Sequence, residues 1–257
     1  MKFPTLLSPI RIGSMEVKNR FVVPPMGTNY ATEQGIPTQQ FIDYYTARAK
    51  GGFGLIIGEV TAVSPIGRAI WNEPGLWCDE QIDGWRKVAE NCHKYGAKVV
   101  PQLHHAGRQT TVDIAGPGAP VAPTPIMDPL LERFGIGEMP RELKTEEVWE
   151  IVGQFRDAAV RAQEAGLDGV EIHGAHGYLV AEFMSAYSNK RIDEFGGDFE
   201  GRMKFPVEIV KAIKKACGNG FNLIFRFSAD ERIYGGRTIE ESKVVARILE
   251  DAGVHAL

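Results

Sequence analysis

The regular alternation of short apolar runs with longer amphipathic segments is the feature that most constrains the fold. Six runs have the composition of β-strands, and several of them are almost continuously apolar, as strands buried on both faces of a parallel sheet are. They are RFVVPPM (20–26), FGLIIGEV (53–60), AKVVPQLHH (97–105), DGVEIHG (168–174), FNLIFRFS (221–228) and GVHAL (253–257).

Segments with helical periodicity separate these runs. The pattern predicts helices over Gln39–Lys50, over Glu80–Tyr95 with Asp79 as N-cap, and over Glu146–Ala165 with Thr145 as N-cap. Thr238 and Glu241 have the spacing of a capping box ahead of a further apolar stripe. Repeated strand–helix units of this length indicate a parallel sheet, either open or closed into a barrel.

The strand count bears on the choice between these two forms. A chain of 257 residues suits one TIM-type (β/α)8 barrel, but only six strand starts occur and the sixth stops at Leu257. We therefore expect an α/β fold that corresponds to such a barrel cut after the start of the sixth strand, without strands seven and eight. The Pro- and Gly-rich stretch Gly107–Lys144 is predicted to be a long loop, and loops of that length are usually functional.

Charge and cysteine content exclude several classes of protein. The net charge of -4 and the isoelectric point near 5.9 do not favour nucleic-acid binding. No apolar run approaches the roughly 20 residues of a membrane span, and the N-terminus lacks the apolar region of a signal peptide. The three cysteines are isolated, with no disulfide, metal or iron–sulfur spacing. A cytoplasmic location is the expectation.

Strand alternation indicates which side chains face the sheet interior. Val170 and Ile172 share one face of their strand, whereas His173 lies on the other. The same parity brings polar side chains of three strands to one face at the carboxyl ends, where barrel active sites lie: Gln102, His104, His173 and Arg226, with His105, His176 and Tyr178 just beyond. Each of these residues could instead have a structural role. Gln102 could be a hydrogen-bonded interior amide, and Arg226 could form an ion pair with Glu171. The histidines could be hydrogen-bonded core residues, and Tyr178 could simply pack.

Four segments, in order along the chain, resemble the old yellow enzyme family of FMN-dependent oxidoreductases. They are NRFVVPPMG (19–27), PQLHHAGRQ (101–109), VEIHGAHGYLVAEFMSAYSNKRIDEFGGDFEGRMKF (170–205) and FRFSADE (225–231). The branch of enoate reductases, dienoyl-CoA reductases and NADH:flavin oxidoreductases is the most similar. The chain departs from the family pattern at Gly27, Ala186, Asp198 and Gly201.

The resemblance implies a reaction and a cofactor. Hydride would pass from NADH or NADPH to FMN, and then to the β-carbon of an α,β-unsaturated carbonyl, enoate or enoyl-CoA. His173 and His176 would clamp the carbonyl oxygen as an oxyanion hole, and Tyr178 would protonate the α-carbon. Gln102 and Arg226 would bind the flavin's pyrimidine edge, and the flavin ring would be lined by Pro25, Met26, Gly27 and Val60.

The resemblance also sets expectations about partners and organisation. The chain would be a single FMN-binding domain over 1–257, with a small-molecule substrate, no nucleic-acid or membrane partner, and a possible homo-oligomeric state. An iron–sulfur cluster is expected only in a longer parent chain.

Two alternatives remain open at this point. A metal-dependent hydrolase could use His104, His105, His173 and His176 as ligands, with Asp230 as a carboxylate. The other alternative is a non-catalytic barrel fragment. The phosphate-binding loops of such barrels follow strands seven and eight, and these strands are not among the six predicted here.

Overall fold

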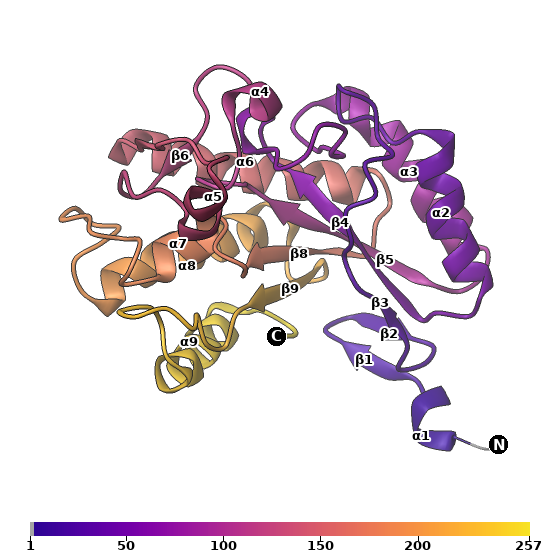
Figure 1. Cartoon of the computed structure of the whole chain (residues 1–257). Helices are drawn as coiled ribbons and strands as arrows, with labels where there is room; N and C mark the ends of the chain where they lie inside the picture. Colours follow the sequence, from indigo (N-terminus) through magenta and orange to yellow (C-terminus); the bar gives the residue numbers. More distant parts are fainter. Residues whose placement is uncertain (1–2) are drawn as a thin grey trace.

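The computed structural model describes residues 3–257, and its centre is a five-stranded parallel sheet in the order β3-β4-β5-β8-β9 (Figure 1). The strands are β3 (Val22–Val23), β4 (Leu55–Ala62), β5 (Lys98–His104), β8 (Gly169–Gly174) and β9 (Asn222–Phe227). Two small sheets accompany it: the antiparallel pair β1 (Ile10–Ile12) and β2 (Met15–Val17), and the parallel pair β6 (Val121–Ala122) and β7 (Arg141–Glu142). The predicted parallel α/β sheet is confirmed, in an open form.

Helices connect the strands, and the longer ones lie along one side of the sheet (Figure 1). The longer helices are α2 (Gln39–Lys50), α3 (Ile82–His93), α6 (Thr145–Glu164), α8 (Phe199–Cys217) and α9 (Ile239–Ala252). The short ones are α1 (Pro4–Leu7), α4 (Val112–Ala115), α5 (Pro129–Phe134), α7 (Leu179–Met184), and the 3₁₀ turns η1 (Pro65–Gly67) and η2 (Asp79–Gln81). Among the described residues, no helix has the length and apolar character needed to cross a membrane.

Three strand predictions need correction. The run 20–26 forms only the two-residue β3, because Pro24 and Pro25 have no N–H to donate to a ladder. The second strand begins at Leu55 rather than at residue 53 and has a register shift between Gly58 and Val60. The run 253–257 makes one isolated bridge, Ile224 with Ala256, beside the edge of β9.

Two helix starts also differ from the prediction. Asp79 does not cap α3, since it begins the turn η2, which follows Cys78. Thr145 lies inside α6 and its hydroxyl donates a 2.6 Å hydrogen bond to Asp193 Oδ2, while Lys144 is the N-cap. The Thr238–Glu241 capping box is confirmed.

The helix α8 is not among the helices that periodicity predicts. The side chain of Asp198 caps it by accepting the backbone N–H of Gly201 at 2.8 Å. A Cβ atom at Gly201 would collide with the carbonyl oxygen of Gly196, so the chain's departure from the family pattern at 201 matches a close backbone approach. Pro206 lies within α8. Proline usually ends a helix, so its presence argues against a helix in this part of the sequence.

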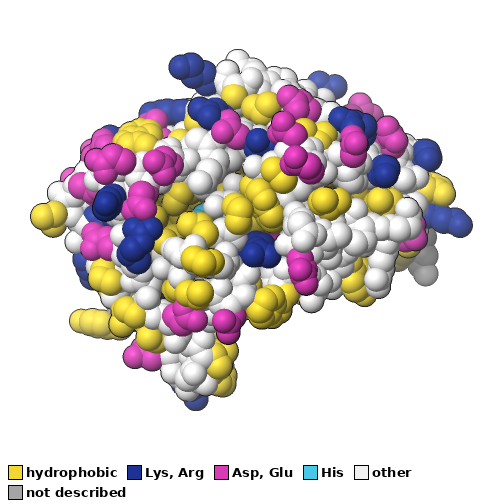
Figure 2. Space-filling view, turned by 90° about the horizontal axis from the view of Figure 1, so that it is seen from above, with side chains coloured by type: hydrophobic (Ala, Val, Ile, Leu, Met, Phe, Trp, Pro, Cys, Tyr) yellow, Lys and Arg dark blue, Asp and Glu magenta, His cyan; other side chains and the backbone are white. Residues whose placement is uncertain are grey.

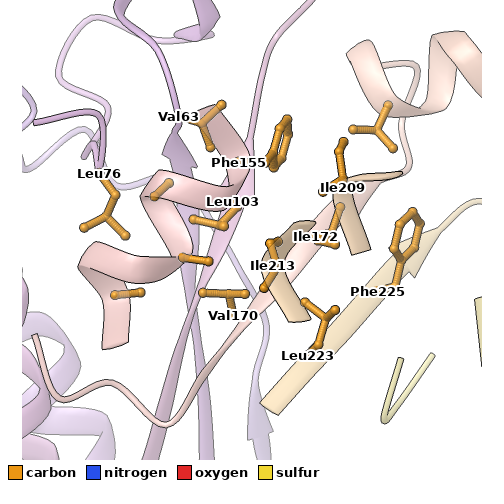
Figure 3. Packing of buried hydrophobic residues seen from close by; sticks show 14 of the residues in the cluster. Val63, Leu76, Leu103, Phe155, Val170, Ile172, Ile209, Ile213, Leu223 and Phe225 are labelled. Carbon is orange, nitrogen blue, oxygen red and sulfur yellow. The ribbon is translucent and has the colours of Figure 1, made fainter. Parts of the chain in front are cut away.

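The main core lies between the sheet and the long helices. Val170, Ile172, Leu223 and Phe225 point towards α6 and α8, in agreement with the predicted parity (Figure 3). The opposite face carries a separate apolar cluster at its N-terminal end, where the β1–β2 hairpin covers it. That cluster consists of Met15, Val17, Leu55, Val100 and Ile224. The carboxyl ends of the strands on this inner face are left for polar side chains.

Candidate active site

The strand register brings the predicted inner-face residues to one end of the sheet. Val60 of β4 pairs with Gln102 of β5, Gln102 pairs with Glu171 of β8, and His173 pairs with Arg226 of β9. Because all of these strands are parallel, their carboxyl ends meet at the same edge. The structure therefore gathers the predicted residues of four strands on one surface.

Gln102 is held by a hydrogen bond across two strands. Its Nε2 donates to Glu171 Oε1 at 2.6 Å, and both side chains are buried. Burial raises the pKa of Glu171 to about 7, although the Gln102 hydrogen bond and the Arg226 charge act in the opposite direction. The bond orients the Gln102 amide, so its carbonyl oxygen remains available as an acceptor.

Arg226 is a half-buried cation without a hydrogen-bond or ion-pair partner among the described residues. Its guanidinium makes no hydrogen bond or ion pair with any residue in the range 3–257. The ion pair with Glu171 considered as a structural role is not formed, because Glu171 accepts from Gln102 instead. The positive charge of Arg226 contributes to the lowered pKa values of His173 and His176. An unpaired guanidinium on this face is suited to an anionic or acceptor-rich ligand.

His173 and His176 face each other. The distance between His173 Nε2 and His176 Nδ1 is 3.2 Å. Burial lowers the pKa of His173 to about 3 and also lowers that of His176, so both rings are neutral near pH 7. His176 has a left-handed backbone with φ of 60°, and two hydrogen bonds hold it there: its N–H donates to Ser228 Oγ, and its carbonyl accepts from Gln109 Nε2.

Tyr178 stands at the start of α7 and packs against two histidines. Its ring centroid lies 4.3 Å from that of His104 and 5.1 Å from that of His173, both in edge-to-face geometry. Burial raises the pKa of Tyr178, and the nearby carboxyls of Glu73 and Asp128 add to that effect. The phenol is therefore fully protonated near pH 7.

The segment Pro25–Gly27 leaves β3 at the same end of the sheet. The backbone N–H of the next residue, Thr28, donates to Glu59 Oε2 at 2.9 Å, which ties the segment to β4. Met26 is 63% exposed, in contrast to the buried Gln102 and His173. The side chain of Met26 thus remains free to contact a ligand.

One expected member of the site is turned away from it. His105 is fully buried, and its Nδ1 accepts the backbone N–H of Gly107 at 3.1 Å. It therefore orders the turn after β5 and does not lie at the rim of the site. His104 does point towards Tyr178, as parity predicts.

The sequence reasoning missed two buried carboxyls close to this surface. Glu73 lies in the connection after β4, next to His104, and Glu59 lies at the β4 bulge, where the Tyr45 hydroxyl also donates to it. Burial raises the pKa of Glu59 to about 7 and that of Glu73 well above its ordinary value. An isolated acid in a loop or at a strand bulge carries no spacing signal that would identify it.

A cavity of about 350 Å³ adjoins His176. Polar and apolar side chains line it, including Arg108, Asp128, Leu130, Tyr187 and Glu231. The view from above shows a small histidine surface enclosed by hydrophobic side chains, with charged side chains around them (Figure 2). Histidine surface is therefore exposed on this face of the molecule.

The histidines do not form a recognisable metal centre. Within residues 3–257, no group of three or more His, Cys, Asp or Glu side chains is placed to hold a metal ion. The His173 ring instead packs against those of His104 and His176, and His104 and His173 both pack against Tyr178.

Comparison with known proteins adds a family relationship. Residues 5–257 match the NADH:flavin oxidoreductase / NADH oxidase family. An NADH oxidase of Thermoanaerobacter brockii is 50% identical over 256 residues, which cover 99% of this chain and 39% of that protein. A metal reductase of Desulforamulus reducens is 40% identical, over 98% of this chain and 36% of that protein. The chain thus spans about two fifths of the length of these relatives.

Solved structures agree with the sequence comparison. A 2-naphthoyl-CoA reductase complex superposes with a TM-score of 0.93 at 31% identity, covering 99% of this chain and 40% of that one. Morphinone reductase superposes with a TM-score of 0.85 at 32% identity, covering 98% of this chain and 70% of that one.

Proposed function

Since this chain belongs to the NADH:flavin oxidoreductase / NADH oxidase family, we propose that it carries the flavin-ring and substrate sites of an FMN-dependent ene-reductase. The proposal treats residues 1–257 as a single FMN-binding domain. Its five-stranded sheet and partial sixth strand would be the front part of a (β/α)8 barrel, which the coverage of 40% of the naphthoyl-CoA reductase chain supports. The family match favours this function over a hydrolase.

The side chains present suit a flavin ring. The Gln102 amide, oriented by Glu171, offers an acceptor and a second N–H to the pyrimidine edge. Arg226, which makes no hydrogen bond or ion pair within residues 3–257, would supply positive charge to N1 and O2 of the ring. The ring would be lined by Pro25, Met26, Gly27 and Val60. Bound FMN would supply hydride chemistry, with NADH or NADPH as the reductant.

His173 and His176 would hold the carbonyl oxygen of the substrate. The facing nitrogens lie 3.2 Å apart, so one oxygen atom placed beside them can reach both. Both rings are neutral, because burial and Arg226 lower their pKa values. Each neutral imidazole has one N–H, and two such donors in a buried site stabilise developing negative charge on that oxygen. The substrate class would be a small α,β-unsaturated carbonyl, enoate or enoyl-CoA.

Tyr178 would deliver the proton to the α-carbon of the substrate. Its raised pKa keeps the hydroxyl protonated, and an enolate is basic enough to remove that proton. The ring contact with His173 places the phenol next to the histidine pair. This grouping of a phenol and two neutral imidazoles at one end of the sheet is the observation that carries the proposal.

The test measures flavin reduction and substrate reduction separately in the FMN-loaded Tyr178→Phe variant. Reduction of the flavin by NADH should be nearly unchanged, whereas reduction of an unsaturated ketone should slow by about 10²–10⁴-fold, as the loss of a positioned acid does. Tyr234→Phe is the matched control, because Tyr234 is fully exposed. An equal loss in both half-reactions would assign Tyr178 a structural role.

A further inference from the structure

Glu73 and His104 form a buried pair whose polar atoms lack ordinary partners. Both side chains are fully buried, and His104 Nε2 lies 3.9 Å from Glu73 Oε1. Glu73 Oε2 accepts the backbone N–H of Ala69 at 2.6 Å. Glu73 Oε1 and both ring nitrogens of His104 have no hydrogen-bond partner within residues 3–257. Buried polar atoms are almost always paired, so three such atoms in one place call for an explanation.

The His104 ring of this pair lies directly against Tyr178. The His104 ring meets the Tyr178 ring edge-on at 4.3 Å between centroids, and it lies 5.6 Å from the ring of His173. His104 is the last residue of β5, whereas Glu73 comes from the connection between β4 and α3. Three separate segments therefore place an acid, an imidazole and a phenol in one series.

The protonation states suit proton transfer along that series. Burial raises the pKa of Glu73 well above its ordinary value, which favours the protonated carboxyl that the series needs. Burial lowers the pKa of His104, and the neighbouring His105, His173 and His176 act in the same direction. A neutral imidazole can accept a proton at one nitrogen while it donates from the other.

We propose that Glu73 and His104 form an internal relay that returns a proton to Tyr178 after each turnover. The inference rests on the proposed role of Tyr178 as proton donor. After Tyr178 protonates the substrate carbon, it is left as a phenolate. The phenolate oxygen takes a proton from one ring nitrogen of His104, and the other nitrogen takes the carboxyl proton of Glu73. The Glu73 carboxylate then takes one hydrated proton (H+) from the solvent, the same proton that reduction of the alkene consumes overall, so charge and protons balance and no electrons move.

The gap between Glu73 and His104 suits water-assisted transfer. Two polar atoms 3.9 Å apart are too distant for a direct hydrogen bond, but one water molecule can bridge them. Such a water would have several buried polar atoms to bind, because these atoms have no other partner within residues 3–257.

The decisive variant is Glu73→Gln, which keeps the shape and an acceptor for Ala69 but has no acidic proton to release. In FMN-loaded protein, the first turnover of pre-reduced enzyme with an unsaturated ketone should keep its normal rate, since Tyr178 begins protonated. Later turnovers should slow at least tenfold, and tyrosinate absorbance should accumulate. His104→Gln should behave in the same way. Glu80→Gln, at an exposed carboxyl, is the control. Steady-state rates equal to those of the unmodified protein would overturn the relay.

A second readout needs neither flavin nor turnover. Infrared spectra of the flavin-free protein should contain the carbonyl stretch of a protonated carboxyl that disappears in Glu73→Gln, and an ionised Glu73 would overturn the relay. The relay and the proposed function can also fail separately. If the Tyr178→Phe variant reduces the unsaturated ketone slowly while the Glu73→Gln variant keeps the normal steady-state rate, only the relay is wrong. If the Tyr178→Phe variant reduces the ketone at the normal rate, the proposed role of Tyr178 is wrong.

Discussion

Gln102 on β5 donates a 2.6 Å hydrogen bond to Glu171 on the neighbouring strand β8, and this bond sets the direction of the Gln102 amide. Both residues are buried on the inner face of the sheet; Glu171 shares β8 with His173, and Arg226 lies on the next strand, β9. The polar floor of the candidate site is thus built across strands that are far apart in the sequence.

Gln102→Ala should weaken FMN binding. One hydrogen bond to the flavin is lost and Glu171 loses its partner, so the cost in binding free energy is about 1–2 kcal/mol, a roughly 5–30-fold rise in Kd. Flavin fluorescence titration measures it. Gln40→Ala, at an exposed position on α2, is the control and should leave Kd unchanged. An unchanged Kd for Gln102→Ala would show that Gln102 is only a structural amide.

Arg226→Met should weaken FMN binding without lowering the stability of the protein. Arg226 has no hydrogen bond or ion pair to lose among the described residues, so we expect the Tm of the flavin-free protein to stay the same or rise. FMN affinity should fall tenfold or more, because a charge-assisted contact is removed. Arg237→Met is the contrasting variant: Arg237 donates to Ser228 O and Ser242 Oγ, and its loss should cost about 2 kcal/mol of stability. A lower Tm for Arg226→Met would contradict the structure.

The stability of the protein should fall as pH rises, partly through Glu182. Burial raises the pKa of Glu182 to about 8 in the folded protein, well above its ordinary value. The folded state therefore binds more protons than the unfolded state between about pH 4.5 and pH 8, and the free energy of unfolding decreases across this window by up to about 1.4 kcal/mol per pH unit for one group.

Glu182→Gln should flatten this dependence, because the amide resembles the protonated carboxyl and can still accept the Arg108 N–H. Urea unfolding at pH 5, 6, 7 and about 8 compares the slopes. Glu132→Gln, at an exposed carboxyl on α5, should leave the slope unchanged. Parallel curves for Glu182→Gln and the unmodified protein would mean that Glu182 ionises normally in the folded state.

The β1–β2 hairpin should contribute strongly to stability. Met15 is 3% exposed and packs with Leu55, Val100 and Ile224 against the inner face of the sheet. Met15→Ala should cost about 2–5 kcal/mol, because it removes buried apolar contacts and leaves a cavity. Its neighbour Glu16 points to solvent, and Glu16→Ala should change stability by no more than about 0.5 kcal/mol. Equal, small effects of the two variants would show that the hairpin does not cover the sheet.

Several features followed from the sequence alone, because they depend on local periodicity. Alternation within a strand placed Gln102, His173 and Arg226 on the inner face, and the register confirms that they share one end of the sheet. Helical periodicity and the Gly51 stop placed the ends of α2, and the Thr238–Glu241 spacing placed the start of α9. In each case the deciding interaction joins residues a few positions apart.

Tertiary contacts decided the remaining features. The Glu73–His104 pair, the Gln102–Glu171 bond and the hairpin over Val100 each join segments that are distant along the chain, so no spacing in the sequence predicts them. The unusual protonation states have the same origin. A carboxyl or an imidazole changes its pKa when folding removes water from around it, and only the packed structure shows that Glu73 and His104 are fully buried beside Tyr178.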